Sequence, residues 1–377
     1  MKLDAIIQET NAHFCLECGI CTGSCPVSRI NPGYSPRLFV EKSLLISEDE
    51  LIEDSDLWTC LTCGACSARC PSRVDYNEFM RRTRSLAIDV DNRGICTHAG
   101  TIQAIASLQK QDFVTKDLSW IPSEMKTQES GETLLFVGCT PYYEVIFRDI
   151  NAGSLTPVVS AIKILNAVGV APVIRSDERC CGHDAYWTGE IEKFKILAQK
   201  NIDMVKKAGA KRVIFTCAEG FSTFKTLYPR FFSELNFEVL HISQFIAEKI
   251  ASGELKLREN GHKVTYHDPC RLGRFESEFD APRNALLAIP KLELVEMSRN
   301  RENALCCGSS TWINCTRINK RIQVEKLKEA QATGATTLVT ACPKCKIHLS
   351  CTKHDNGFDV NIEIKDLATL VAENLQA

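Results

Sequence analysis

CLECGICTGSCP at residues 15–26 and CLTCGACSARCP at residues 60–71 decide the architecture of the first part of this 377-residue chain. Each stretch places four cysteines at the spacing Cys-x-x-Cys-x-x-Cys-x-x-x-Cys and ends in proline, and the two agree at every one of these positions. Two-residue gaps let one tight loop direct three thiolates to one face of a compact metal group. The small residues between the cysteines leave room for backbone N–H groups to approach the same group. The two stretches therefore predict two metal centres close together in the sequence.

This spacing is that of bacterial ferredoxins, in which the fourth cysteine of each run binds the other [4Fe–4S] cluster. We expect one cubane cluster on Cys15, Cys18, Cys21 and Cys70, and a second on Cys60, Cys63, Cys66 and Cys25. Zinc also uses C-x-x-C pairs, but a four-ligand zinc site leaves the third cysteine and the proline of each run unexplained. The leucine and phenylalanine spacing between the two runs indicates helices, so we predict a helical two-cluster ferredoxin domain.

Composition limits the partners and the compartment. The formal net charge is −2, which argues against nucleic acid or an anionic membrane as the main partner, since both select a basic surface. The first 14 residues lack the basic and long apolar regions of a signal peptide, and the most apolar later stretch, 158–174, is interrupted and too short to span a bilayer. Twenty cysteines without an export signal indicate metal rather than disulfides. We therefore expect a cytoplasmic protein that reaches a membrane only through a partner.

The rest of the chain contains an internal repeat. Three cysteine landmarks occur twice in the same order, with the matched cysteines 125 to 131 residues apart: 133–139 and 263–270, 180–182 and 306–308, and 213–217 and 338–342. In each copy, the first and third landmarks are short apolar runs that end on a cysteine, and the second is Cys-Cys-Gly. A nearly fixed interval between ordered landmarks is the signature of a duplicated structural unit.

Within each copy, apolar runs of four to six residues suit strands that are covered on both faces, as in a parallel sheet. Residues 189–208 have the periodicity of an amphipathic helix, and a second helix is predicted to begin at Asp280 as N-cap, with Pro282 in its first turn. This alternation predicts doubly wound sheets with right-handed crossovers. Cysteines that end the strands would then lie at the carboxyl edge, where such folds bind their ligands.

The predicted fold class is thus α plus α/β. The helical two-cluster domain spans residues 1–110, and a polar linker spans 111–131. Two duplicated α/β units with parallel-type sheets follow over 132–260 and 261–377.

The second unit carries five cysteines: Cys270, Cys306, Cys307, Cys342 and Cys345. Their arrangement resembles the CCG cysteine-rich domain of heterodisulfide reductases and of the iron–sulfur subunits of glycolate, lactate and anaerobic glycerol-3-phosphate oxidoreductases. A ferredoxin domain followed by two CCG domains resembles the D-type subunit of heterodisulfide reductase, in which C-type and B-type parts are fused. The resemblance covers nearly the whole chain and implies that these five cysteines hold a noncubane [4Fe–4S] cluster. Five thiolates also exceed what zinc or an ordinary cubane uses.

The first unit departs from the CCG pattern. It keeps Cys139, Cys180, Cys181 and Cys217, but Gly220 stands where the last cysteine is expected. Four thiolates could hold a modified cluster, a zinc ion or nothing. Glu219 and His183 are candidates for a substitute ligand, although a surface glutamate and a core histidine are the simpler interpretations.

Several residues near the motifs have two interpretations. His267 and Asp268, just before Cys270, could hydrogen-bond the cluster region, but a turn that ends the strand is the interpretation we favour. Cys96, Cys315 and Cys351 belong to no motif and are predicted to be ordinary buried or surface thiols. The chain has no Walker motif, and no G-x-G-x-x-G follows a predicted strand, so nothing indicates that it binds flavin or nicotinamide itself.

Two classes of function remain open. The chain could be the catalytic subunit that reduces a small disulfide at the noncubane cluster, or a conduit between a flavin-bearing subunit and another enzyme. We predict a heterodisulfide-reductase-like iron–sulfur subunit of a larger redox complex, passing electrons through two cubane clusters to the noncubane cluster. The alternative is an electron-transfer subunit of a flavin-dependent glycolate, lactate or glycerol-3-phosphate dehydrogenase.

Overall fold

The computed structural model describes residues 2–233, 235–313, 315–355 and 360–376. Its N-terminal part is helical, as predicted, and comprises α1 Leu3–Glu9, α2 Ile20–Ser24, α3 Pro26–Ile30, α4 Pro36–Leu45, α5 Glu48–Glu53, α6 Asp56–Thr59, α7 Tyr76–Asp89 and α8 Thr101–Leu108. Local sequence signals start these helices. Pro26 and Pro36 occupy the first positions of α3 and α4, and Ser47 and Glu50 form a capping box at α5.

The first α/β unit contains three parallel strands in the order β1-β2-β3: β1 Thr133–Phe136, β2 Arg212–Phe215 and β3 Glu238–His241. Its helices are α9 Thr140–Ile146, α10 Thr156–Ala167, α11 His183–Thr188, α12 Ile191–Ala208, α13 Ala218–Ser222 and α14 Ile242–Ala251. The amphipathic helix predicted over 189–208 is confirmed as α12. It begins two residues late because Gly189 takes a φ of +92° and ends α11.

The second unit has four parallel strands in the order β5-β4-β6-β7: β4 Lys263–His267, β5 Glu293–Leu294, β6 Thr337–Thr340 and β7 Glu363–Asp366. Its helices are α15 Asp280–Leu287, α16 Arg317–Gln331, α17 Pro343–His354 and α18 Leu367–Glu373. The helix predicted to start near Asp280 is present, but the N-cap is Phe279 and Asp280 is its first helical residue. The predicted α plus α/β class with parallel sheets is confirmed.

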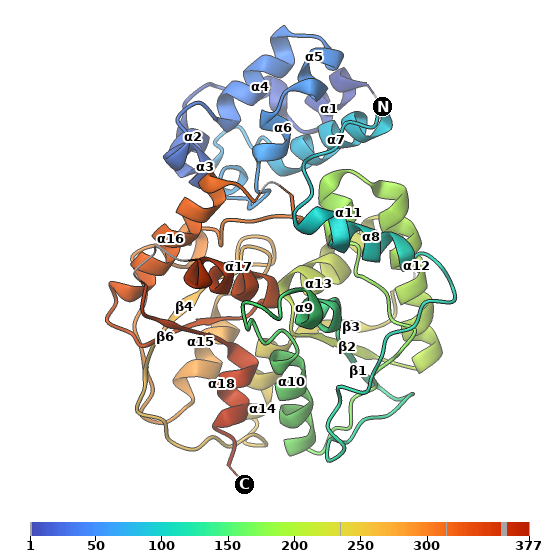
Figure 1. Ribbon diagram of the computed structural model, residues 1–377, viewed down its shortest axis with the longest axis vertical. Coiled ribbons are helices and arrows are strands. Elements are labelled where there is room, and N and C mark those ends of the chain that lie inside the picture. The colour runs from blue at the N-terminus through green and yellow to red at the C-terminus, as the bar shows by residue number, and fades with distance from the viewer. Residues whose placement is uncertain (1, 234, 314, 356–359, 377) are drawn as a thin grey trace.

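The two units pack against each other through equivalent helices. Helix α10 of the first unit packs on α18 of the second, and α14 of the first packs on α15 of the second. Helices α10 and α15 each lie between the first cysteine and the Cys-Cys-Gly motif of their unit, and α14 and α18 each follow the last strand. The exchange of equivalent helices is what an approximate two-fold axis between the units produces. The N-terminal helices lie across one end of this pair (Figure 1).

A buried arginine fastens the N-terminal helices to the first unit. Arg84 on α7 is 1% exposed and donates hydrogen bonds to the carbonyl oxygens of Leu57, Cys60 and Trp187. At the same contact, a Cβ on Gly189 would lie 2.5 Å from the backbone nitrogen of Ser85, so only glycine permits this approach. The helical domain is therefore fixed against the CCG-like part rather than tethered to it.

The segment 111–131, predicted to be a linker, contains no helix or strand beyond an isolated bridge at Gln128. It nevertheless packs on the first unit. Lys116 is buried, pairs with the buried Glu178 and donates to the carbonyl oxygen of Gly138 at 2.6 Å. None of the described helices combines the length and mean hydropathy that crossing a bilayer requires.

Candidate metal centres

The cysteines of the first predicted cluster lie near the surface. Cys18 is exposed, and Cys15, Cys21 and Cys70 are partly buried. Burial raises the pKa of the Cys21 thiol, and the neighbouring Cys15 and Cys18 raise it further. The loop 15–21 thus gathers three thiols near the surface of the helical domain.

The cysteines of the second predicted cluster are buried and come from both runs. Cys60, Cys63 and Cys66 lie in one loop, and burial raises the pKa of Cys25 to about 12, with Cys60 and Cys63 among the groups that act on it. Burial also raises the pKa of Cys66, which is affected by Cys25 from the other run. The fold therefore brings Cys25 to the cysteines of the other run, the arrangement that cross-ligation requires.

All five cysteines of the second CCG-like set form one connected group. Cys306 hydrogen-bonds Cys270 and Cys307, Cys307 contacts Cys345, and Cys345 contacts Cys342. Three elements position them: the end of β4, the loop before α16, and the step from β6 into α17. Gly308 after the cysteine pair has a φ of +83°, and a Cβ there would lie 2.9 Å from the carbonyl oxygen of Asn319. Only glycine adopts this conformation at this close approach without strain.

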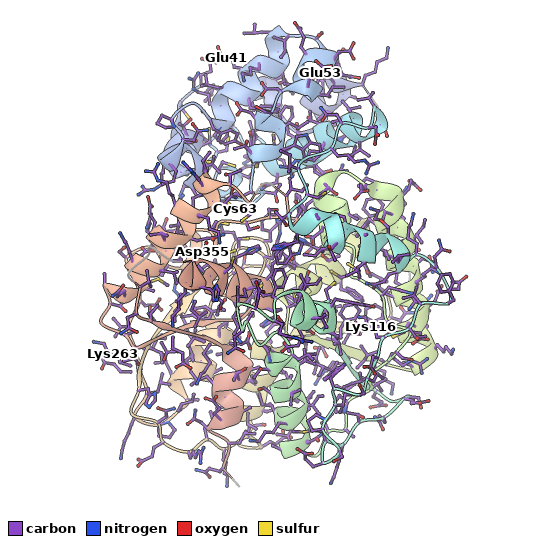
Figure 2. The ribbon with its side chains drawn as sticks, in the orientation of Figure 1. Glu41, Glu53, Cys63, Lys116, Lys263 and Asp355 are labelled. Atoms are coloured by element: carbon purple, nitrogen blue, oxygen red, sulfur yellow. The ribbon has the colours of Figure 1, made fainter. Side chains whose placement is uncertain are left out.

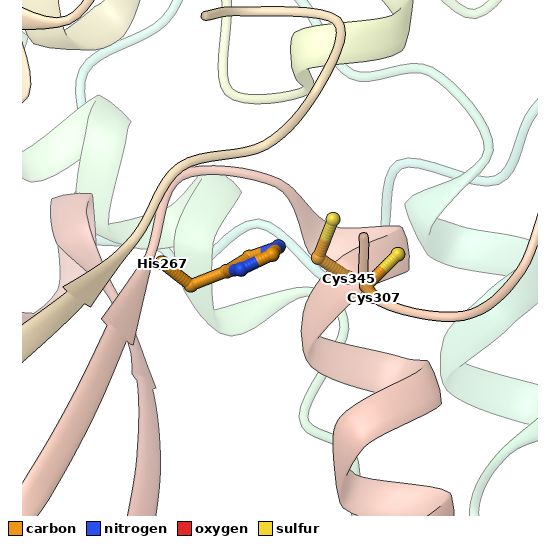
Figure 3. Close-up of side chains that lie close together, drawn as sticks. All are labelled: His267, Cys307 and Cys345. Carbon is orange, nitrogen blue, oxygen red and sulfur yellow. The ribbon is translucent and has the colours of Figure 1, made fainter. Parts of the chain in front are cut away.

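His267 belongs to this centre, contrary to the turn interpretation that we favoured. It is the last residue of β4, is fully buried, and one ring nitrogen lies within 4.8 Å of the sulfurs of Cys307 and Cys345. Figure 3 shows the imidazole edge directed at the two sulfurs. Asp268 turns away and pairs with Arg283 at 2.7 Å. Of these two adjacent residues, His267 thus faces the thiols and Asp268 forms a salt bridge within the second unit.

The second ferredoxin set and the second CCG-like set touch. The thiol of Cys63 hydrogen-bonds that of Cys306, and this bond, helped by Arg274 and Arg271, lowers the pKa of Cys63 to about 5. Figure 2 places Cys63 at the boundary between the helical domain and the two units. Arg274 donates to the carbonyl oxygen of Cys63 at 2.8 Å. The hydrogen bond with Cys306, helped by the same two arginines, lowers the pKa of Cys270. Positive charge is therefore concentrated where the two sets meet.

In the first unit, three of the four cysteines are linked by hydrogen bonds, and the fourth contacts a cysteine of the other unit. Cys180 hydrogen-bonds both Cys139 and Cys181. Cys217 instead hydrogen-bonds Cys342 of the second unit, although all four first-unit cysteines line one pocket. At Gly220 a Cβ would lie 3.1 Å from the ring of Phe215, so a cysteine at this position would press against that ring. The backbone is thus tightly packed at the position where the fifth cysteine is missing.

Charged groups fill the first site. The nearly buried Lys344 of the second unit reaches into it and pairs with Asp184 at 2.7 Å and Glu219 at 3.1 Å. The prediction of a surface glutamate is wrong, because the Glu219 side chain is only 16% exposed and is held by this lysine. His183, Asp184 and Glu219 could together hold a metal ion, but the Lys344 ammonium already pairs with both carboxyl groups.

His183 is a core residue, as the simpler interpretation held. Burial lowers its pKa to about 4, so the ring is neutral at physiological pH. Its Nε2 accepts a hydrogen bond from Arg271 at 2.9 Å, and its Nδ1 lies 2.9 Å from Asp184. Arg271 also donates to Thr62 of the ferredoxin domain, so one chain of polar contacts joins all three parts of the protein.

Sequence reasoning missed the charged residues of the site. Arg271, Arg274 and Lys344 each stand within four residues of a motif cysteine, which is the one signal that could have singled them out. A basic residue beside a cysteine can equally face solvent, so only the fold shows these three turned inward. The leftover thiols Cys96 and Cys351 also proved to share one pocket with Cys315.

Comparisons with known proteins agree with this geometry. The 4Fe–4S dicluster domain family matches residues 11–74, and the CCG cysteine-rich domain family matches residues 133–225 and 264–350. Over 266 residues, the chain is 34% identical to the D-type subunit of the dihydromethanophenazine:CoB–CoM heterodisulfide reductase of Methanosarcina barkeri, covering 68% of this chain and 62% of that protein. Over 225 residues it is 28% identical to the EtfAB:quinone oxidoreductase of Syntrophomonas wolfei, covering 57% of this chain and 30% of that protein. The chain thus spans less than two thirds of the length of these relatives.

A solved structure shares the fold. The crystal structure of a hypothetical protein from Helicobacter pylori covers 99% of this chain and 76% of its own length, with a TM-score of 0.61 at 11% identity. The domain matches, the likeness to the heterodisulfide reductase subunit and the buried cysteine groups lead to one conclusion. The chain belongs to the iron–sulfur oxidoreductase subunits that join a 4Fe–4S dicluster domain to two CCG cysteine-rich domains, the family that includes the D-type subunit of heterodisulfide reductase.

Proposed function

We propose that the chain passes single electrons from a surface cubane cluster, through a buried cubane cluster, to a noncubane cluster in the second CCG unit. The observation that carries this proposal is the contact between Cys63 and Cys306. It joins a ligand of the buried cubane directly to a ligand of the terminal cluster. Electron transfer between clusters needs close approach without solvent, and both cysteines are buried.

The surface cluster is the proposed site of electron exchange with a partner. Cys18 is exposed, and three large apolar side chains beside it are exposed as well: Phe14 by 60%, Leu16 by 71% and Ile20 by 45%. Apolar residues gathered around a redox centre support docking of another protein. A flavin-bearing subunit suits this position, because a flavin can divide a two-electron transfer into single-electron steps.

The terminal cluster is proposed to be noncubane because five connected thiols surround one site. Arg271 and Arg274 would stabilise the negative charge that the cluster and its thiolates carry, and His267 would hydrogen-bond a ligand sulfur. Hydrogen bonds and nearby charges of this kind tune cluster potentials. The first unit, with four thiols and Lys344, is proposed to be auxiliary, holding a modified cluster, zinc or no metal.

Metal analysis tests this assignment. We expect about eight irons from the ferredoxin domain and about four from the second CCG unit, with matching acid-labile sulfide. The measurement is iron and sulfide content of the protein reconstituted to saturation without oxygen, with zinc measured in parallel. Eight irons or fewer at saturation would remove the noncubane cluster from the proposal. A Cys345→Ser variant serves as the comparison and should lose the last four irons alone.

A further inference from the structure

A lysine amine lies against a cysteine sulfur near the surface of the second unit. Lys320 on α16 approaches Cys351 on α17, with 3.0 Å between Nζ and Sγ. The same amine pairs with Asp355 at 2.7 Å, and Asp355 is the C-cap of α17, one turn after Cys351. Two partners on neighbouring turns of one helix therefore hold the amine at the sulfur. Neither Lys320 nor Cys351 belongs to the predicted cluster-binding motifs.

Small molecules can reach this pair. Lys320 and Cys351 line a pocket with about 890 Å³ of unfilled space, and Cys351 is only partly buried. His348 lines the same pocket, is 5% exposed, and its Nε2 has no hydrogen-bond partner among the described residues. His348 and Cys351 are three residues apart on α17 and are therefore neighbours on its surface. A peroxide, which both donates and accepts hydrogen bonds, suits an unpaired ring nitrogen beside a thiol.

The charge on Lys320 assists oxidation of the sulfur. Burial acts against the charged amine, but the bonds to Asp355 and Cys351 raise the pKa of Lys320 overall. The ammonium is therefore retained beside Cys351. A neighbouring cation favours the thiolate, which is the form that peroxide oxidises to a sulfenic acid. The same ammonium can give a proton to the hydroxide that leaves the peroxide, and this leaves a neutral amine in contact with an electrophilic sulfur.

We propose that Lys320 and Cys351 form a reversible sulfur–nitrogen bond when the protein meets peroxide. The Cys351 thiolate attacks one peroxide oxygen, the O–O bond breaks, and the leaving hydroxide takes a proton from the Lys320 ammonium and becomes water. The neutral amine then attacks the sulfenic sulfur, an S–N bond forms, and the S–O bond breaks as a second water leaves. The cysteine is oxidised by two electrons, and the peroxide is reduced by two. Sulfenic acids condense with a neighbouring nitrogen in this way, and two molecules of a small thiol reverse the bond by becoming a disulfide.

The bond joins two helices that frame the terminal cluster site. Helix α16 packs on α17. Asn319, next to Lys320, donates at 2.8 Å to the carbonyl oxygen of Gly308, the glycine after the cysteine pair. Helix α17 carries Cys345 in its first turn. A covalent link between the helices therefore fixes two segments of that site against each other. The link needs no electron from the clusters, so it does not depend on the proposed electron-transfer function.

The experiment treats the reconstituted full chain with a small molar excess of hydrogen peroxide, with cluster absorbance recorded before and after. Peptide mass spectrometry should find the Lys320 and Cys351 peptides joined, with two hydrogens fewer than the separate peptides, and dithiothreitol should separate them. Cys351→Ser should abolish the joined product. Absence of the joined peptides, or a Cys315–Cys351 disulfide as the main product, would overturn the proposal.

An arginine pair provides the matched control. Lys320→Arg keeps a cation beside the sulfur, but a guanidinium stays protonated and does not attack, so the link should be lost and dimedone should trap the sulfenic acid on Cys351. Lys328→Arg, at an exposed position of the same helix, should form the link as the unmodified protein does. Equal dimedone labelling of Cys351 in the two variants would contradict the role of Lys320. The readout is peptide mass rather than turnover, so a negative result contradicts the link and leaves the proposed function standing.

Discussion

The two CCG units share a fold and a cysteine order but differ in the side chains at their centres. In the second unit, five thiols form one group with His267 beside them and two arginines at the contact with the ferredoxin domain. In the first unit, one thiol is lost and a lysine from the other unit fills the site, held by two carboxylates. The two units thus share a frame but differ in the groups at its centre, and the second unit is the one whose thiols contact the buried ferredoxin-type set.

The largest expected difference between the units is in electron delivery. Cys307→Ser should abolish delivery to the terminal acceptor, because Cys307 lies at the centre of the connected group in the second unit. The equivalent change in the first unit, Cys181→Ser, should retain most of the delivery. The measurement is reduction of the acceptor by a natural partner, with ferredoxin-type signals recorded to show that the cubane clusters remain.

The reverse outcome would break the comparison. If Cys181→Ser stopped turnover in a folded protein and Cys307→Ser did not, the first unit would be the working one. Loss of delivery in both variants would mean that the two sites act together.

The next effect concerns stability at the junction of the units. Lys344→Met should lower the free energy of unfolding by about 3–5 kcal/mol, because Asp184 and Glu219 would be left buried without a cation. The control is Lys263→Met, which removes a half-exposed partner of Glu293 and should cost about 1 kcal/mol or less. Urea unfolding followed by fluorescence measures both.

A second change sharpens this prediction. Burial raises the pKa of Glu219, and adding Glu219→Gln to Lys344→Met removes one of the two buried carboxyl groups left without a partner, so the double variant should be more stable than the sum of the two single changes predicts. Simple additivity would show that Lys344 and Glu219 do not act as a pair.

The smallest expected effect is a difference in pH response. His241 and Asp366 end the last strand of their units and cap the following helices. Burial lowers the pKa of His241 to about 4, and burial raises the pKa of Asp366 to about 7. A lowered histidine pKa contributes stability that is present above about pH 6.5 and is lost as the pH falls towards 4. A raised carboxyl pKa contributes stability that is present below about pH 4 and is lost as the pH rises towards 7.

Between about pH 5 and 7, the two contributions change by roughly 2 kcal/mol each with opposite sign. Relative to the unmodified protein, His241→Asn should therefore lose stability on going from pH 5 to pH 7, and Asp366→Asn should gain it. Asparagine keeps a capping side chain at both positions. Parallel pH profiles for the two variants would contradict the assignment of these groups.

Local patterns predicted much of the fold: the leucine and phenylalanine spacing predicted the helical domain, the repeated apolar runs predicted the duplicated parallel units, and the cysteine spacing predicted the five-cysteine group. The contacts between the three parts of the protein could not be predicted from these local patterns. Cys63 meets Cys306, and Cys217 meets Cys342, across more than a hundred residues of sequence. Such pairs depend on how three folded parts pack together, which no local periodicity encodes. Lys344 was equally unpredictable, because it lies in the second unit of the sequence but its side chain pairs with two carboxyl groups of the first unit.

The Glu219–Lys344 contact has a consequence for assembly. The two residues follow their strand-end cysteines by the same interval and meet across the approximate two-fold axis. If two first units paired with each other, glutamate would face glutamate, and two second units would bring lysine against lysine. Burying like charges in this way is strongly unfavourable. The difference between the two units at this one position therefore disfavours pairing of either unit with a copy of itself and favours the pairing of a first unit with a second.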